Sequence, residues 1–259
     1  QQKPMVLASG TLAVGEDFHR FKEATGLLTD GRVRESVSPS PFAYSKNCLL
    51  YVPSLPARQK AGQYYDKLTE EITALLDAAH GHALVLFTSY AAMSAVKERL
   101  REKGLTYPLF TLGRNAVHTT KQFKSTPGGV LLATGAAWEG FDFPGDCVSL
   151  LVIPRLPFPI PDALKEKERE QYPTLHSFLR GVVVPEMQIK LKQGFGRAIR
   201  TETDTCVVAI LDERAARDPR YWKDVLAALP EMPVTQDIHR VEAFIRGVKP
   251  DSYFREGAA

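Results

Sequence analysis

The feature of this sequence that most restricts its fold is a series of short runs that are apolar at every position. Strands covered on both faces have this pattern, whereas a strand with one face in water alternates apolar and polar residues. Helical stretches lie between most of the runs, which predicts a doubly wound, mainly parallel α/β sheet with helices on both faces. The runs occupy residues 5–8, 48–52, 83–87, 130–134, 148–153 and 205–211.

The segments between these runs predict helices, turns and one long loop. Ser89 is placed to cap a helix over 89–103, which Gly104 is placed to end. The segment 154–173 is rich in proline, which predicts an irregular excursion with at most a short helix. Pro185 suits the first turn of a helix that runs through Arg200. Further helices are predicted over 18–27, 58–79, 215–229 and 236–247.

Length and composition describe an ordinary globular domain. The 259 residues are predicted to form one domain, and because Gln1 leads almost at once into an apolar run, we expect a domain cut from a longer polypeptide. Lys and Arg number 33 against 30 Asp and Glu, an excess well below the basic footprint of a dedicated nucleic-acid binder. No apolar run approaches the ~20 residues that span a bilayer, so we expect no membrane contact and a cytoplasmic setting.

The three cysteines, Cys48, Cys147 and Cys206, stand far apart, with no CxxC pair and no histidine tract beside them. The spacing of a metal site is therefore absent, and no metal ligands are predicted in this chain. Each cysteine is interpreted as a small buried hydrophobe.

The strongest local signal is the segment QGFGRAIR at residues 193–200. On a helix, about 100° per residue brings Gln193, Arg197 and Arg200 within roughly 60° of one another, so two guanidiniums and an amide project together. Paired arginines offer planar donors that stay charged, which suits the charge on a transferring phosphoryl group. A solvated basic face is the alternative. The two glycines favour function, because each costs about 1 kcal/mol in a helix unless a backbone or ligand comes close.

A second signal, ATGAAWEGFDFPG, begins at residue 133, where the run 130–134 ends. Ligands bind beyond the carboxyl ends of parallel strands, and a glycine-bearing turn there exposes backbone N–H groups to phosphates. Asp142 is a candidate acceptor for a ribose hydroxyl. The alternative is an ordinary turn after a strand, with Trp138 in the core and Glu139 and Asp142 exposed.

Two shorter segments carry signals that structure alone also explains. The run 83–87 leads into Thr88, Ser89 and Tyr90, where a helix N-terminus attracts phosphate and the tyrosine ring can stack on a base. Serine and threonine are also ordinary helix caps, so the pattern does not decide between the two. The same holds for ASGTL at residues 8–12.

The segment VVAILDE at residues 207–213 resembles the apolar strand and acidic pair that hold magnesium in nucleotide hydrolases. No GxxxxGK[ST] phosphate loop occurs in the sequence, so the cradle that such acids would serve is missing. We therefore interpret Asp212 and Glu213 as the start of the following helix.

Taken in order, ASGTL, FTSY (87–90), ATGAAWEGFD and QGFGRAIR resemble motifs III, IV, V and VI of superfamily 2 helicases. The WEGFDFPGD form of the fifth motif, the LPF after it and the form of the sixth resemble the DinG/XPD family in particular. The similarity covers nearly the whole chain. It implies a RecA-like second motor domain over residues 1–259 that faces an N-terminal motor domain of the same polypeptide, with ATP between them and single-stranded DNA across both.

The resemblance also implies roles on the nucleotide side. Arg197 and Arg200 would be arginine fingers at the γ-phosphate. Gln193 would assist near the nucleotide, and Asp142 would contact the ribose.

On the DNA side, the resemblance implies that Glu139 and Gly140 join the nucleotide site to the DNA site. The residues near the DNA backbone would be Thr88, Ser89, Tyr90, Thr134 and Gly135. Ser9 and Thr11 would belong to the segment that couples hydrolysis to domain movement. The family's direction of travel would be 5′ to 3′.

The family's first and second motifs, which supply the phosphate loop and the magnesium-binding acids, are absent from the sequence. ATP and Mg²⁺ would therefore be shared with the missing domain, and we expect the isolated chain to hydrolyse no ATP. An iron–sulfur cluster is not expected in this chain, and one elsewhere in the longer protein is left open. A non-catalytic RecA-like module that binds single-stranded DNA or a protein is the alternative. A Rossmann-like enzyme is disfavoured because no GxGxxG follows a predicted strand.

Overall fold

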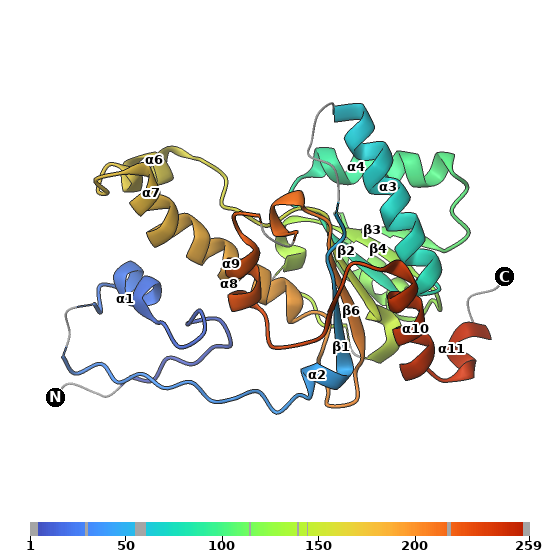
Figure 1. Cartoon of the computed structure of the whole chain (residues 1–259), viewed down its shortest axis with the longest axis horizontal. Coiled ribbons are helices and arrows are strands. Elements are labelled where there is room, and N and C mark those ends of the chain that lie inside the picture. The colour runs from blue at the N-terminus through green and yellow to red at the C-terminus, as the bar shows by residue number, and fades with distance from the viewer. Residues whose placement is uncertain are drawn as a thin grey trace.

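The computed structural model describes residues 5–28, 31–54, 61–113, 115–138, 140–143, 145–216 and 219–255. Its centre is a seven-stranded sheet in the order β3-β4-β2-β5-β6-β1-β7, in which every neighbouring pair is parallel (Figure 1). The predicted fold class is confirmed. The strands are β1 (Cys48–Tyr51), β2 (Ala83–Leu86), β3 (Leu109–Thr111), β4 (Val130–Ala133), β5 (Leu150–Ile153), β6 (Cys206–Ile210) and β7 (Val234–Thr235).

Helices cover both faces of this sheet, each over its own apolar core. One core includes residues of α3 (Ala61–Ala78), α4 (Tyr90–Glu102), α10 (Ile238–Val248) and α11 (Asp251–Arg255). The other includes residues of α5 (Ala116–Lys124), α8 (Val184–Phe195) and α9 (Trp222–Ala228). The five central strands, β1, β2, β4, β5 and β6, are buried at every position, which is why their sequences are apolar throughout.

Several predicted helix boundaries are confirmed. The Ser89 side chain accepts a hydrogen bond from Ala92 N and caps α4, and Gly104, with φ +69°, follows the end of that helix. Helices α1 (His19–Thr25), α3, α9 and α10 lie within or close to the predicted segments. The proline-rich excursion contains one short helix, α6 (Ala163–Arg169), as predicted.

Several elements differ from the prediction. Residues 5–8 are an exposed coil and not a strand, because an isolated apolar run has no neighbouring strand to bond with in this sheet. Strands β3 and β7 and helix α5 were not predicted. Both strands lie at the sheet edges and are short, and they are not buried throughout, so they lack the continuous apolar pattern.

The helix at Pro185 begins earlier than predicted. A helical rod starts at α7 (Leu175–Phe178), with a capping box between Thr174 and Ser177, and passes through a π-helical turn, Leu179–Val183, into α8. Pro185 lies in the first turn of α8, directly after the π turn. Because proline has no N–H to donate, a local change of hydrogen-bond pattern lets the rod continue past it.

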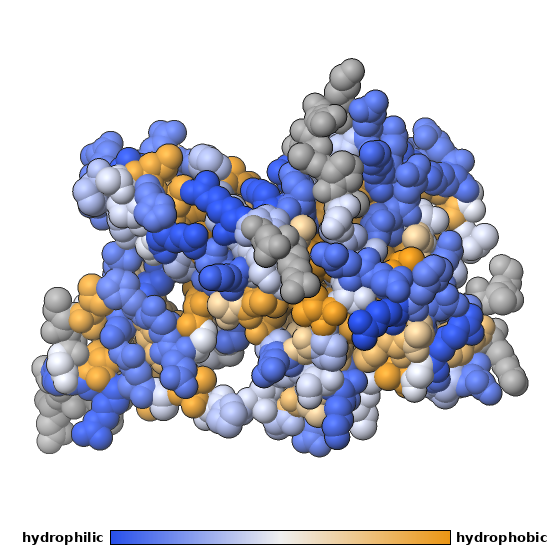
Figure 2. Space-filling view, viewed as in Figure 1, coloured by the Kyte–Doolittle hydropathy of each residue, from blue (hydrophilic) through white to orange (hydrophobic). Residues whose placement is uncertain are grey.

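A region beside the sheet joins α1, α6 and the start of α8 (Figure 1). Arg20 of α1 forms ion pairs with Glu168 of α6 and Glu186 of α8, and Lys165 pairs with the same two carboxylates. Burial opposes the charge of Arg20, but these carboxylates outweigh it and raise its pKa. Figure 2 shows apolar side chains among hydrophilic ones over α6 and α7, where Leu164 and Leu175 are exposed.

Cys48 and Cys206 are buried and lie opposite each other on β1 and β6, while Cys147 is half-buried. Burial raises the pKa of Cys48 to about 12 and that of Cys147 to about 11, so both thiols stay protonated at neutral pH. Among the described residues, no group of three or more potential ligand side chains could hold a metal ion. The described helices include none long and apolar enough to cross a membrane.

Candidate functional site

The segments after β2 and β4 meet at one edge of the sheet. These strands are neighbours with Leu86 opposite Ala133, and Phe87 N donates to Ala133 O at 2.8 Å. Thr88 and Thr134 therefore follow adjacent strands at their carboxyl ends, where parallel sheets bind ligands.

The side chains that the sequence predicts for DNA contact differ in exposure at this edge. Tyr90 is 66% exposed and Ser89 is also exposed, although its hydroxyl caps α4. Thr134 is buried, and the exposed Gly135 has φ +62°, a left-handed conformation that favours glycine. The edge thus offers an exposed aromatic ring beside a turn with an accessible backbone.

Arg197 and Arg200 do not lie on a helix, which corrects the prediction. Helix α8 ends at Phe195, and the chain continues as a turn in which Arg197 N donates to Gly194 O at 3.0 Å and Ala198 N to Phe195 O at 2.8 Å. Glycine has the second-lowest helix propensity after proline, so the two glycines of this segment favour an end to the helix here.

The two arginines nevertheless converge, on the loop after β4. Both guanidiniums donate to the Phe141 carbonyl, Arg197 through Nη1 and Arg200 through Nη2, the latter at 3.2 Å. Arg200 Nε also lies 2.8 Å from Asp142 Oδ1, but this N–H is buried without a hydrogen-bond acceptor in line, so the contact is an ion pair. Backbone contacts support the arrangement: Arg197 Nε donates to Gln193 O at 3.4 Å, and Gly140 N donates to Ala136 O at 3.0 Å.

Asp204, which was not among the predicted site residues, holds the backbone at Arg200. Its carboxylate accepts hydrogen bonds at 2.8 Å from Arg200 N and Thr201 N and at 2.7 Å from Thr201 Oγ1. Burial works against ionisation of this carboxyl, but the Thr201 hydroxyl and the backbone N–H groups outweigh it and lower its pKa. The signal in the sequence was the spacing of Thr201 and Asp204, in which the acidic side chain can return to the backbone three residues earlier.

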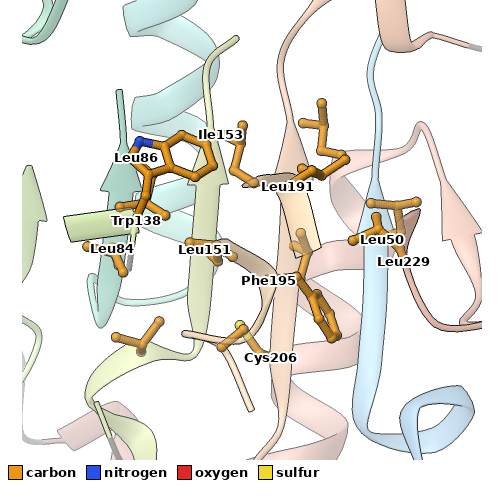
Figure 3. Close-up of a cluster of buried hydrophobic side chains, with 14 of the residues drawn as sticks. Leu50, Leu84, Leu86, Trp138, Leu151, Ile153, Leu191, Phe195, Cys206 and Leu229 are labelled. Carbon is orange, nitrogen blue, oxygen red and sulfur yellow. The ribbon is translucent and has the colours of Figure 1, made fainter. Parts of the chain in front are cut away.

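Trp138 joins the segments just described (Figure 3). It is 1% exposed, as the structural alternative predicted, and its indole N–H donates to Phe87 O at 2.9 Å. A Cβ atom at Gly194 would lie only 2.7 Å and 2.8 Å from two carbons of the indole ring. Gly194 is therefore required by a side chain, and not by the backbone or ligand that its helix cost suggested.

A shallow groove borders the same loop and was not predicted. Its volume is about 550 Å³, and its lining is mostly apolar, with two lysines on α5. The ammonium of Lys124 lies 5.8 Å from the centre of the Phe143 ring. The groove is lined by Val117, Thr120, Lys121, Lys124, Ser125 and Phe141.

Asp212 has a structural role, as the sequence indicated. It is 1% exposed, caps the short helix Glu213–Ala215, pairs with Arg214 and accepts a hydrogen bond from Leu156 N at 2.8 Å. The Arg214 guanidinium lies 4.6 Å from the centre of the Phe158 ring. Asp212 therefore anchors the LPF segment to the end of β6.

Ser9 and Thr11 do not join these segments. Their hydroxyls lie 3.3 Å apart in the exposed coil before α1. The coil reaches α8 at Ala13, whose carbonyl lies 3.5 Å from Lys192 Nζ. Glu139, the remaining predicted site residue, lies outside the described residues.

Comparisons with known proteins identify the family of this chain. The profile of a family described as "Helicase C-terminal domain" matches residues 72–232. The chain is 35% identical over 254 residues to the ATP-dependent DNA helicase YoaA of Escherichia coli (strain K12), covering 94% of this chain and 38% of that protein. It is also 35% identical over 245 residues to the ATP-dependent helicase DinG of Mycobacterium tuberculosis (strain ATCC 25177 / H37Ra), covering 93% and 37% respectively.

A solved structure titled XPD helicase has the same fold as this chain. The TM-score is 0.55 at 20% identity, over 73% of this chain and 35% of the other. The chain spans little more than a third of the length of the curated relatives described above. Because the family profile covers more than half of the chain and most of the sheet, the chain belongs to the family of helicase C-terminal domains.

Proposed function

We propose that this chain is the second motor domain of an ATP-dependent DNA helicase. In this proposal, residues 1–259 form one RecA-like half of a longer cytoplasmic protein, and ATP is hydrolysed at the interface with an N-terminal motor domain. Hydrolysis drives 5′-to-3′ movement along single-stranded DNA. The names of the DinG and YoaA relatives support ATP use and DNA as the substrate.

The observation that carries the proposal is the convergence of Arg197 and Arg200 on one carbonyl oxygen. A carbonyl oxygen is a neutral acceptor, whereas a phosphate is charged and can accept two parallel hydrogen bonds from one guanidinium. A γ-phosphate presented near Phe141 would therefore draw the guanidiniums from the carbonyl and close the domain onto the nucleotide. Loss of that phosphate would return them and reopen the cleft.

The other proposed nucleotide contacts are assigned from the positions of their residues in the fifth and sixth motifs. Asp142 is 66% exposed at its side chain and is available to a ribose hydroxyl once Arg200 turns to phosphate. Gln193, which precedes Gly194 at the end of α8, assists near the nucleotide. Glu139 and Gly140 link this side to the DNA side.

The described residues fit one side of a bound ATP. They supply guanidiniums for phosphate and a carboxylate for ribose, but no cluster of acids that could hold a magnesium ion. In our proposal the N-terminal motor domain supplies the phosphate cradle and the ligands of Mg²⁺. The isolated chain is therefore expected to bind ATP poorly and to hydrolyse none.

Single-stranded DNA would cross the carboxyl edge of the sheet. The residues near its backbone would be Thr88, Ser89, Tyr90, Thr134 and Gly135, with the exposed ring of Tyr90 available for stacking on a base. Ser9 and Thr11, in the coil before α1, would couple hydrolysis to domain movement when the N-terminal motor domain is in place. The alternative remains a non-catalytic module that binds single-stranded DNA or a protein passively.

The test is ATP turnover by the full-length protein, with and without single-stranded DNA, in Arg197→Ala and Arg200→Ala. Each substitution is expected to lower DNA-stimulated turnover about a thousandfold, because each removes an arginine finger. Binding of single-stranded DNA is expected to persist, since neither arginine belongs to the proposed DNA contacts.

Arg246→Ala is the matched control. Arg246 lies on α10 over the opposite face and pairs with Glu242, so its removal is expected to leave turnover unchanged. If Arg197→Ala and Arg200→Ala turn over ATP like this control, the sixth motif has a structural role and the passive module is favoured. Turnover by the isolated chain with DNA would contradict the proposed division of the ATP site.

A further inference from the structure

Trp138 contacts both the segment that leads to the proposed DNA contacts and the segment that leads to the arginines. It ends the short 3₁₀ helix Gly135–Trp138, directly after the turn that follows β4, and is buried in the core between β2, β5 and α8. Figure 3 shows its ring among Leu86, Ile153 and Leu191. Its neighbours therefore include the strand that leads to the DNA contacts and the helix that leads to the arginines.

On the DNA side, the contact is a directed hydrogen bond. The indole N–H donates to Phe87 O at 2.9 Å, and Phe87 is the residue immediately before Thr88. Strand β2 ends at Leu86, so this carbonyl lies at the point where the chain leaves the sheet. A shift of the ring would break the bond or carry the start of the Thr88–Tyr90 segment with it.

On the nucleotide side, the indole ring packs directly against the backbone of Gly194. A Cβ at Gly194 would lie at 2.7 Å from the ring, and the Gly194 carbonyl accepts the hydrogen bond from Arg197 N that forms the arginine turn. Lys190, one helical turn earlier, places its ammonium 5.9 Å from the ring centre, within the range of cation–π attraction. The indole is therefore in close contact with the segment that ends in the arginine turn.

We propose that Trp138 is a positioning residue that couples the arginine turn at Arg197 to the DNA contacts after β2. The inference rests on the proposed function and deepens it, because it identifies a physical link between the two sites. A plain apolar core would need neither feature, since a leucine fills space without an N–H to satisfy, and an alanine at position 194 favours a helix. The link also predicts that a change on either side is felt on the other.

The test uses the full-length protein and measures the affinity for single-stranded DNA with and without a non-hydrolysable ATP analogue. The ratio of the two dissociation constants is the coupling factor, which is reciprocal between the two ligands. Trp138→Phe keeps an aromatic ring but removes the N–H, and it is expected to bring the coupling factor about fivefold closer to one. Trp222→Phe is the matched control, because Trp222 begins α9 on the same face of the sheet and is expected to leave the factor unchanged.

Gly194→Ala approaches the same link from the other side. The new methyl group would push the indole away, so the coupling factor is again expected to fall. The double variant Trp138→Phe with Gly194→Ala is expected to couple no worse than Trp138→Phe alone, because the N–H is already absent and the smaller ring leaves room for the methyl group. Contacting residues of this kind are non-additive, whereas independent core residues add.

Hydrogen exchange of the backbone over residues 87–93 gives a readout that needs no DNA. Binding of the ATP analogue to the unaltered protein is expected to change exchange in this segment, and Trp138→Phe is expected to abolish the change. The proposal is overturned if Trp138→Phe and Gly194→Ala both keep the coupling factor and the exchange response of Trp222→Phe. If the unaltered protein shows neither DNA-stimulated turnover nor nucleotide-dependent DNA affinity, the proposed function fails and this inference fails with it.

Discussion

The fifth and sixth motifs are assembled within this chain, whereas the segment that resembles the third motif is not. Phe141, Asp142 and Trp138 contact Arg197, Arg200 and Gly194 directly. Ser9 and Thr11 contact each other in an exposed coil, and their segment reaches α8 through one long hydrogen bond at Ala13. The region of the fifth and sixth motifs is therefore held together by contacts within this chain. The coil with Ser9 and Thr11 leaves polar and apolar groups exposed.

This difference separates contacts that the domain forms by itself from contacts that need a second domain. In the proposed function, the arginines that bind phosphate need a fixed position relative to the acid that binds ribose, and the contacts among Phe141, Asp142 and Arg200 provide it within this chain. In the same proposal, the segment with Ser9 and Thr11 would gain its partners only when the N-terminal motor domain is in place. Substitutions should therefore be costly to stability in the assembled region and nearly neutral in the coil.

The largest expected loss of stability follows from Asp212→Asn, beside the assembled region. Breaking the buried pair with Arg214 and weakening the bond to Leu156 N is expected to lower the free energy of unfolding by about 3 kcal/mol. Urea unfolding measures it, and a loss below about 0.5 kcal/mol would show that the LPF segment does not depend on this anchor.

The same pair has a pH dependence. Burial disfavours the charge of Asp212, but Arg214 outweighs it and lowers the folded-state pKa below the unfolded value of about 3.9. A lowered pKa stabilises the fold above that unfolded value, and this contribution is lost as pH falls through the folded value. The difference between the unaltered protein and Asp212→Asn is therefore expected to shrink below about pH 4, and a difference that persists at lower pH would contradict the assignment.

A smaller loss is expected for Gly194→Val. The added side chain meets the indole of Trp138 in a filled core, and such overpacking costs about 2 kcal/mol. Thermal unfolding measures the loss, and Gly247→Val is the control because nothing lies within 4 Å of a Cβ at Gly247 in α10. The difference between the two variants is the part of the loss that is due to the indole. Equal losses in the two variants would mean that the indole moves aside freely.

Arg20→Met tests the region that joins α1, α6 and the start of α8. Its expected loss of stability lies between the losses expected for the assembled region and for the coil. The arginine side chain is 16% exposed and its ion pairs with Glu168 and Glu186 are partly screened, so a loss of about 1 kcal/mol or less is expected. Hydrogen exchange of α1 is expected to rise, and the effect should diminish at high salt. An increase in exchange that spreads into the central strands would show that α1 belongs to the main core.

The smallest effect is expected for Ser9→Ala with Thr11→Ala. The hydroxyls of Ser9 and Thr11 contact each other in the coil before α1, and their removal is expected to change the free energy of unfolding by less than about 0.5 kcal/mol. Urea unfolding of the chain checks this, while DNA-stimulated turnover of the full-length protein is expected to fall. A large loss of stability would remove the contrast between the two regions.

Much of the fold was predictable because burial on both faces leaves a direct mark on sequence. The five central strands are apolar throughout and were all predicted, whereas β3 and β7 are short edge strands with mixed burial. The run at residues 5–8 has the same composition as a strand, and composition cannot reveal that no partner strand is available.

The arrangement of the candidate site was not predictable from the sequence. Arg197 and Arg200 were expected on one helical face, but they converge from a turn whose position depends on Gly194 and Asp204. The acceptor that joins them is a backbone carbonyl, which carries no side-chain signal. The reason for Gly194 was also hidden, because the indole that occupies its space lies 56 positions earlier in the chain.

The most direct test of the account is Arg200→Lys in the full-length protein, with ATP turnover and single-stranded DNA affinity measured on the same sample. Lysine keeps the charge but lacks the planar fork that contacts both the Phe141 carbonyl and Asp142. The account predicts a loss of DNA-stimulated turnover of at least about tenfold, with DNA affinity unchanged. Turnover equal to that of the unaltered protein would contradict it, because charge alone would then suffice and the geometry at Phe141 would have no part in the reaction.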